Sequence, residues 1–183
     1  MKELSLNILD IAENSTKANA SLVEISIIEK DDTLTLTIKD NGTGMTSEVL
    51  ESVKNPFYTT RTTRKVGMGI PLLQCAAEQT GGRLDIESKH FSLFPDCHGT
   101  TVTALFYKNH IDFTPIGDAS SSIVTLIQGH PNVDFLFKHS IGEKEVLLDT
   151  RELREVLENV PLDTFEVLIW IKENLAEQYS VLQ

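Results

Sequence analysis

The chain has 183 residues, 40% hydrophobic and 23% charged, which is typical of one globular domain or of one domain with a small extension. Its formal net charge of −11 disfavours non-specific binding to nucleic acid or to an anionic membrane surface. The two cysteines, Cys75 and Cys97, lack zinc-site spacing, so we expect reduced thiols in a cytoplasmic protein. The sequence has no signal-peptide core and no run of about 18 apolar residues, and we expect neither export nor membrane insertion.

Residues 3–19 predict an amphipathic helix. Its polar stripe consists of Asn7, Asp10, Asn14 and Lys17, whose spacing places them on one face. Such a stripe is most often a solvated surface. It could instead serve a metal and phosphates, because an Asn carbonyl can ligate Mg²⁺, a Lys can contact phosphate and an Asp can orient a water.

A predicted hairpin follows, with strands at 21–29 and 33–40, and it ends in a glycine turn. Asp40 continues the alternation of Leu34, Leu36 and Ile38, so its carboxylate should face the core side of the sheet. Gly42 and Gly44 follow and permit a tight turn and close approach to the backbone. A plain turn is one interpretation; the other is a site for an amino-bearing ring such as adenine.

A short helix is expected from Thr46 to Val53, and then an irregular loop over residues 54–66. The loop contains four threonines and four cationic residues in a strongly acidic chain. Gly67-Met68-Gly69-Ile70 then precedes a helix that should run to about Thr80, and a glycine-rich helix start is a natural anion site.

The remaining chain predicts alternating short elements. Strands are expected at 83–88 and 99–106, and residues 109–122 have the composition of a linker. Beyond the linker we expect strands at 123–129, 133–139 and 145–149, and then helices at 150–159 and 163–178. This gives a domain at 1–108 and a small α+β extension at 122–183 of unknown role, which should pack on the first unit or on a partner.

The order of these motifs resembles the ATP-binding domain shared by gyrase, Hsp90-type chaperones, sensor histidine kinases and MutL. The resemblance spans roughly residues 4–107. The matching segments are Asp10–Asn14 with Lys17 (the N box), Asp40–Met45 (the first glycine box), Asn55–Arg61 (the kinase F box), Gly67–Ile70 (the second glycine box) and Gly99–Thr101 (the final Gly-Thr element).

The resemblance implies a fold: an α/β two-layer sandwich of the Bergerat type, with a mixed, mostly antiparallel sheet. It also implies ATP or ADP and Mg²⁺ as ligands. By the resemblance, Asp40 binds the adenine amino group with help from Thr100, and Asn14 ligates Mg²⁺. The other residues that it places at the nucleotide are Lys17, Gly42, Gly44, Met45, Phe57, Thr60, Arg61 (or Arg64), Gly67, Met68, Gly69 and Ile70.

Asp10 departs from the family pattern. Hydrolysing members carry Glu at this position and sensor kinases usually carry Asn, so the shorter Asp leaves the activation of water open. The polar helix begins within the first dozen residues, so we expect no phospho-accepting histidine domain before it. His90, His98, His110, His130 and His139 lie downstream and are interpreted as ordinary polar residues.

Two classes of function remain open. One is an enzyme: a slow ATPase, or a phosphotransferase that acts on a separate protein, including a regulatory kinase of the anti-sigma type with a serine-bearing partner. The other is a non-catalytic, nucleotide-gated module that binds a protein partner. Both need ATP, we expect a protein partner in addition, and neither needs nucleic acid or membrane.

Overall fold

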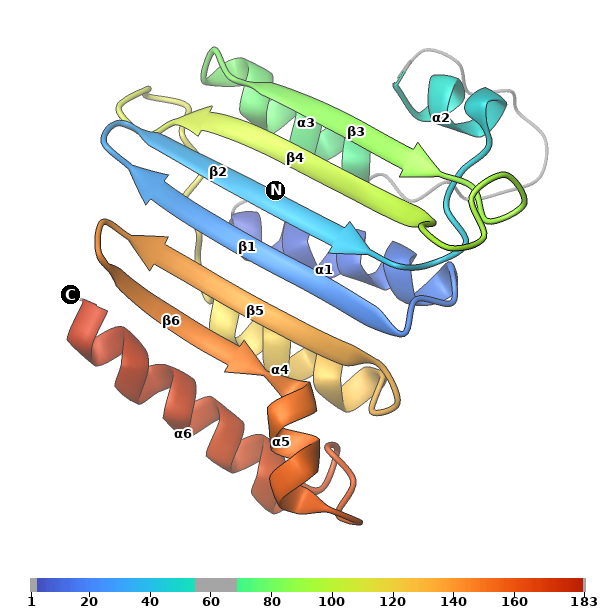
Figure 1. The fold of residues 1–183 in the computed structure, drawn as a ribbon. Coiled ribbons are helices and arrows are strands. Elements are labelled where there is room, and N and C mark those ends of the chain that lie inside the picture. Colours follow the sequence, from blue (N-terminus) through green and yellow to red (C-terminus); the bar gives the residue numbers. More distant parts are fainter. Residues whose placement is uncertain (1–2, 55–68, 183) are drawn as a thin grey trace.

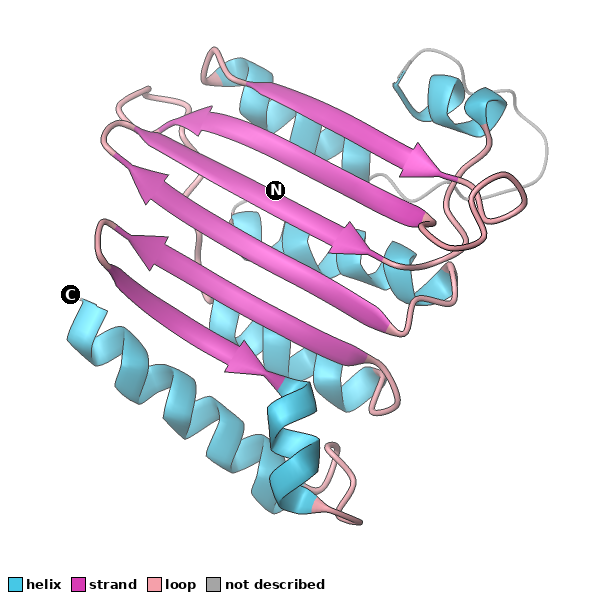
Figure 2. Ribbon diagram, in the orientation of Figure 1, coloured by secondary structure: helices cyan, strands magenta, loops and turns pink. Residues whose placement is uncertain are grey.

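The computed structural model describes residues 3–54 and 69–182. One six-stranded sheet, in the order β3-β4-β2-β1-β5-β6, runs through the whole of this part (Figures 1 and 2). Its strands are β1 (Leu22–Lys30), β2 (Thr33–Asp40), β3 (Arg83–Lys89), β4 (Gly99–Tyr107), β5 (Asp134–Ile141) and β6 (Lys144–Asp149). The helices are α1 (Leu4–Lys17), α2 (Ser47–Lys54), α3 (Gly69–Gln79), α4 (Ala119–Gly129), α5 (Thr150–Leu157) and α6 (Phe165–Leu182).

The sheet is mixed and mostly antiparallel, since only the β1–β5 pairing is parallel. The helices α1, α3 and α4 lie side by side behind one face, and α6 packs beside α4 along the β6 edge (Figure 1). The predicted two-layer α/β sandwich is thereby confirmed.

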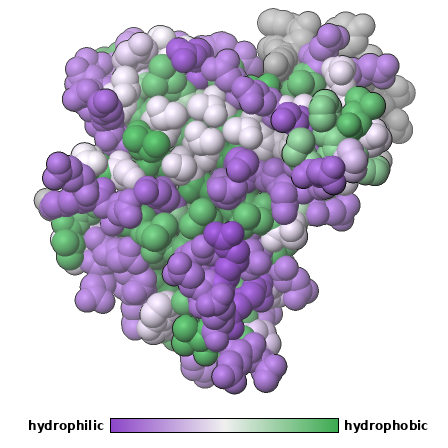
Figure 3. All heavy atoms as spheres, viewed as in Figure 1, coloured by the Kyte–Doolittle hydropathy of each residue, from purple (hydrophilic) through white to green (hydrophobic). Residues whose placement is uncertain are grey.

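The core lies between the sheet and this helix layer, because each central strand alternates between two faces. In β2 the apolar residues Leu34, Leu36 and Ile38 are buried, whereas the threonines between them face the other side. Figure 3 looks onto that open face, where pale, weakly polar side chains and some apolar ones gather over the strands. The core is completed by large side chains from distant strands, Phe106, Phe135 and Phe137, all fully buried.

The segment predicted as a linker forms backbone hydrogen bonds with the first residues of α1. The carbonyls of Pro115 and Ile116 accept hydrogen bonds from the backbone N–H groups of Leu4 and Ser5, at 2.9 and 2.8 Å. The first N–H groups of a helix have no partner within the helix, so these carbonyls complete its N-terminus. The segment therefore fixes α4, which follows it, against α1.

The strand predicted at residues 123–129 is wrong, because these residues lie in helix α4. The β-branched run Ile123-Val124-Thr125 is typical of a strand when the residues before it are left out of account. The helix begins at Ala119, and the Asp118 side chain caps it by accepting from the Ser121 N–H at 2.8 Å. Its buried positions have helical spacing: Ala119, Ser122, Ile123, Leu126 and Ile127.

The C-terminal segment is part of the same sheet, through the pairing of β5 with β1. A partly buried polar network reinforces this contact at the end of β1 that lies away from Asp40. His139 on β5 contacts a Glu29 carboxylate oxygen at 3.1 Å and the Tyr179 hydroxyl of α6 at 2.9 Å. The other Glu29 oxygen accepts from Lys108 at 3.0 Å. This network ties β1, β5, α6 and the end of β4 together.

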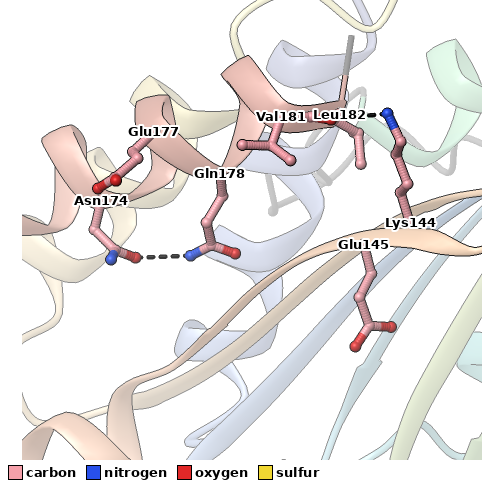
Figure 4. A pocket seen from close by; sticks show the side chains of 7 residues that line it. All are labelled: Lys144, Glu145, Asn174, Glu177, Gln178, Val181 and Leu182. Carbon is pink, nitrogen blue, oxygen red and sulfur yellow. Dashed lines mark hydrogen bonds between the residues drawn. The ribbon is translucent and has the colours of Figure 1, made fainter.

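Helix α6 covers the β6 edge of the sheet. The Gln178 amide donates to the Leu147 carbonyl at 3.0 Å and accepts from the Leu147 N–H at 2.8 Å, as an adjacent strand would. Figure 4 shows the cavity of about 350 Å³ beside this contact, lined by Lys144, Glu145 and residues of α6. Lys144 closes one end of it by donating to the Val181 carbonyl at 2.9 Å. These contacts protect an edge that could otherwise pair with another strand.

Candidate functional site

A row of three polar residues crosses the sheet where β2 ends. Asp40 pairs with Thr100 across β2 and β4, and Thr100 pairs with Ser88 across β4 and β3. All three continue the alternation of buried apolar residues on their strands, so they lie on the side of the sheet that the helices cover. The predicted orientation of Asp40 agrees with this geometry.

The Asp40 carboxylate is held by three hydrogen bonds. One oxygen, Oδ1, accepts from the backbone N–H groups of Gly42 and Thr100, at 2.9 and 3.2 Å. The other, Oδ2, accepts from the Ser15 hydroxyl of α1 at 2.7 Å. An ionised carboxylate has about four lone-pair positions, so one position on Oδ2 remains for a ligand.

Ser15 was not predicted as a site residue. Its spacing from Leu4, Ile8 and Ile11 puts it on the apolar side of α1, and all four residues are buried. Only the approach of α1 to the end of β2 brings its hydroxyl to Asp40. A lone polar residue in an apolar stripe was the available signal, because a buried hydroxyl needs a partner.

The glycine turn after Asp40 packs tightly against the β3–β4 connection. Gly44 has φ of 67°, in the left-handed region that favours glycine, and a Cβ there would collide with the Lys89 carbonyl. The next residue, Met45, is partly buried against the core, and its N–H donates to the Ser88 hydroxyl at 2.8 Å. The turn is thus hydrogen-bonded to both ends of the row of polar residues, to Asp40 through Gly42 and to Ser88 through Met45.

Ser88 is the second site residue that sequence reasoning missed. Besides accepting from Met45, its hydroxyl donates to the Gly99 carbonyl at 3.1 Å and contacts the Thr100 hydroxyl at 2.8 Å. Its strand could be predicted, but its place beside Thr100 depends on the register between β3 and β4.

The start of α3 lies directly on α1. A Cβ added to Gly69 would sit 3.0 Å from the Cβ of Asp10, which places the N-terminal end of α3 beside the exposed polar face of α1. The N–H groups of a first helical turn are unpaired within the helix and attract anions. Ile70 follows and is partly buried against the core. The structure therefore brings the predicted N box and the end of the second glycine box together.

The residues of the polar stripe of α1 differ in their exposure to solvent. Asp10 is exposed and Asn14 is partly exposed, whereas Asn7 is buried, with 1% of its surface exposed. The Asn7 Nδ2 has no hydrogen-bond partner within residues 3–54 and 69–182. Lys17 is exposed at the end of the helix, 3.9 Å from Glu13, whose carboxylate also contacts His130 at 2.8 Å.

Several predicted site residues fall outside the described part of the chain: Phe57, Thr60, Arg61, Arg64, Gly67 and Met68. Within residues 3–54 and 69–182, no group of three or more His, Cys, Asp or Glu side chains could hold a metal ion. In the same ranges, no helix has the length and apolar character needed to cross a membrane.

Comparison with known families identifies the first part of the chain. The profile of the family described as "Histidine kinase-, DNA gyrase B-, and HSP90-like ATPase" matches residues 1–110. The chain is similar to a probable C4-dicarboxylate sensor kinase of Halalkalibacterium halodurans, with 34% identity over 83 residues, which cover 45% of this chain and 15% of the kinase. It is also similar to sporulation kinase C of Bacillus subtilis, with 30% identity over 91 residues, which cover 49% of this chain and 20% of the kinase.

These matches leave most of each kinase without a counterpart, since the matched residues make up only 15% and 20% of their lengths. Among solved structures, the chain is similar to the Aquifex aeolicus MutL ATPase domain complexed with ADP, with a TM-score of 0.53 and 17% identity. That match covers 86% of this chain and 70% of the MutL chain. At this identity the likeness establishes the fold.

Proposed function

Because the chain belongs to the family of histidine kinase-, DNA gyrase B- and HSP90-like ATPases, we propose that it binds ATP or ADP together with Mg²⁺. We further propose that it hydrolyses ATP slowly or transfers the γ-phosphoryl group to a protein partner. The observation that carries this proposal is the placement of two chemically different groups on one side of the sheet. One is the Asp40 carboxylate, which keeps a free acceptor position at the end of β2, and the other is the helix N-terminus beside Asp10.

Asp40 and Thr100 recognise the adenine ring. The free acceptor position on Asp40 Oδ2 suits the exocyclic amine, and a hydrogen bond to an ionised acceptor is stronger than a neutral one. Three fixed donors hold the carboxylate before the base arrives, so little reorganisation accompanies binding.

The residues at the other end fit Mg²⁺ and phosphates. Asn14 supplies an amide oxygen, and Mg²⁺ is commonly bound by one or two protein oxygens together with substrate phosphates and waters. This mode of binding needs no cage of three acidic or imidazole ligands, and residues 3–54 and 69–182 contain none. The ion would neutralise phosphate charge, the first N–H groups of α3 would contact phosphate oxygens, and Lys17 would supply a further positive charge.

Asp10 is the candidate general base. Its exposed carboxylate lies beside Gly69, where the phosphates would approach α3. In hydrolysis it would orient a water, whose oxygen attacks the γ-phosphorus while the bond to the β–γ bridging oxygen breaks, giving ADP and phosphate. Asp is one methylene shorter than Glu, which reduces its reach and favours a slow reaction.

The kinase names of the similar proteins support phosphoryl transfer to a protein as the second form of the reaction. The nucleotide-gated module is the alternative function, and the short side chain of Asp10 favours it. In that case ATP binding alone would set the state of the chain, and the partner would read that state.

One experiment separates these forms. The protein is incubated with γ-labelled ATP and Mg²⁺, alone and with cell extract, and both free phosphate and labelled proteins are followed. Asp10→Asn is compared with wild type for turnover and for ATP binding. Lost turnover with retained binding supports catalysis by Asp10. Binding without turnover in the wild type, with or without extract, supports the gated module, and absence of ATP binding contradicts the proposal.

A further inference from the structure

The Ser88 hydroxyl lies in the row with Thr100 and Asp40 and has three hydrogen-bond partners. The Met45 N–H is 2.8 Å away and can only donate. The Gly99 carbonyl is 3.1 Å away and can only accept. The Thr100 hydroxyl is 2.8 Å away and could do either. A serine hydroxyl has one proton to give and two lone pairs to accept with.

Only one arrangement makes all three contacts hydrogen bonds. Ser88 gives its proton to the Gly99 carbonyl and accepts from Met45 and from the Thr100 hydroxyl. The opposite arrangement, with Ser88 donating to Thr100, would leave the Ser88 oxygen facing the Gly99 carbonyl oxygen without a proton between them. The proton of Thr100 is therefore directed at Ser88, and only lone pairs of Thr100 remain for a ligand.

Asp40 beside it is likewise an acceptor. It is paired with Thr100 across the two strands, and its carboxylate accepts from Ser15, Gly42 and the Thr100 N–H. The positions that these two neighbouring groups leave free for a ligand are thus all acceptors. Such a pair is complementary to an amino group on a base and repels a carbonyl oxygen at the same place.

We propose that Ser88 is a positioning residue that selects the base: it holds the Thr100 hydroxyl as an acceptor and so favours a 6-amino purine over a 6-oxo purine. This inference rests on the proposed function, because it concerns the base end of the same nucleotide site. Ser88 acts through Thr100 and needs no contact of its own with the nucleotide.

The test compares ADP with IDP, in which a carbonyl replaces the amino group at position 6 and N1 carries a proton. Their dissociation constants are measured by calorimetry with Mg²⁺ for the wild type and for Ser88→Ala. The alanine frees the Thr100 hydroxyl to turn and donate to the 6-oxo group. We expect the wild type to prefer ADP and the preference to fall about tenfold in Ser88→Ala, the scale of one hydrogen bond.

Two further variants separate this role from a general structural one. Ser88→Thr keeps the hydroxyl and should keep the preference. Ser26→Ala makes the same change on β1, on the open face of the sheet, and should also keep it. Loosening of the turn through Met45 would weaken ADP and IDP alike, so the ratio of the two affinities isolates the effect on Thr100.

A double-mutant cycle gives an independent readout. After Thr100→Val has removed the hydroxyl, Ser88→Ala should change the ADP preference no further. If Ser88→Ala does not fold, Ser88→Cys takes its place, because it keeps the size while weakening both the donor and the acceptor.

The outcomes are distinct. An unchanged ADP preference in Ser88→Ala, or a wild type that binds ADP and IDP equally, overturns the inference while leaving nucleotide binding intact. A wild type that binds neither nucleotide overturns both the inference and the proposed function. A reduced preference that Ser88→Thr restores supports the role of the hydroxyl.

Discussion

Gly69 and Asp10 lie so close that a single methyl group on Gly69 would sit 3.0 Å from the Asp10 Cβ. Few real Cβ contacts are this short, so a side chain at Gly69 would push the N-terminus of α3 away from α1. The absence of a side chain there is what lets the helix N-terminus and the polar face of α1 lie together at the place where we propose that phosphates bind.

Gly69→Ala should therefore weaken nucleotide binding. Crowding in a packed contact costs about 1–3 kcal/mol, and displacement of α3 moves its N–H groups away from the phosphates. We expect ATP affinity to fall by about tenfold in calorimetry. Gly129→Ala is the matched control, since Gly129 is also helical and a Cβ there meets no atom within 4 Å. Equal ATP affinity in the two variants would contradict this account of Gly69.

Asn7→Leu should stabilise the protein. The buried Asn7 amide N–H₂ has no partner among the described residues, which costs about 1–3 kcal/mol, and leucine of similar size removes that cost and adds apolar burial. We expect the free energy of unfolding, measured with urea, to rise by about 1 kcal/mol.

The paired variant is Asn7→Asp, which keeps the shape and introduces a charge at the same buried position. It should lower the free energy of unfolding well below that of wild type. A loss of stability in Asn7→Leu would mean that the amide has a partner, and the account of Asn7 as an unsatisfied group would be rejected.

The His139 network should make stability depend on pH. Burial lowers the pKa of His139 below its ordinary value, although the contact with Glu29 opposes this effect. Burial also raises the pKa of Tyr179, which keeps its hydroxyl protonated as a donor to His139. In the unfolded chain the imidazole binds a proton below about pH 6.5, where the folded protein still holds it neutral.

The unfolded state then binds more protons, so the stability that His139 contributes is present above about pH 6.5 and is lost as the pH falls from there toward its lowered folded pKa. We expect the stability difference between wild type and His139→Gln to shrink when the pH is lowered from about 7.5 to about 5.5. His110→Gln, on the exposed loop after β4, is the control. A difference that is the same at both pH values would refute this linkage.

Much of the fold could be predicted because it follows from local patterns. The alternation in residues 33–40 predicted β2 with its observed bounds, and the order of motifs predicted the family and the two-layer sandwich. The wrong prediction of a strand at 123–129 also has a local cause, because a short β-branched run can belong to a strand or to a buried helix. The capping residue Asp118, which marks the start of the helix, lies outside this run.

The site could be predicted only where one short segment carries it. Asp40 stood out through its place at a strand end before two glycines, and Thr100 was implied by the family resemblance. Ser15 and Ser88 come to them by the packing of α1 and by the register of β3 on β4. Asn7 shows the same limit, because the spacing along α1 gave its face but not the extent of burial at its N-terminal end.

The central claim is that Asp40 receives the adenine amino group. In Asp40→Asn the amide oxygen would take the place of Oδ1, which accepts from Gly42 and Thr100, and the amide N–H₂ would then replace Oδ2 and face the adenine amine, donor to donor.

Calorimetry of ATP with Mg²⁺ on the wild type, on Asp40→Asn and on Asp85→Asn tests this claim most directly. Asp85 is an exposed aspartate of β3 whose carboxylate contacts only Arg83 among the described residues. We predict measurable binding by the wild type, similar binding by Asp85→Asn, and a loss of at least about tenfold in Asp40→Asn. ATP affinity in Asp40→Asn equal to that of the wild type would contradict the account.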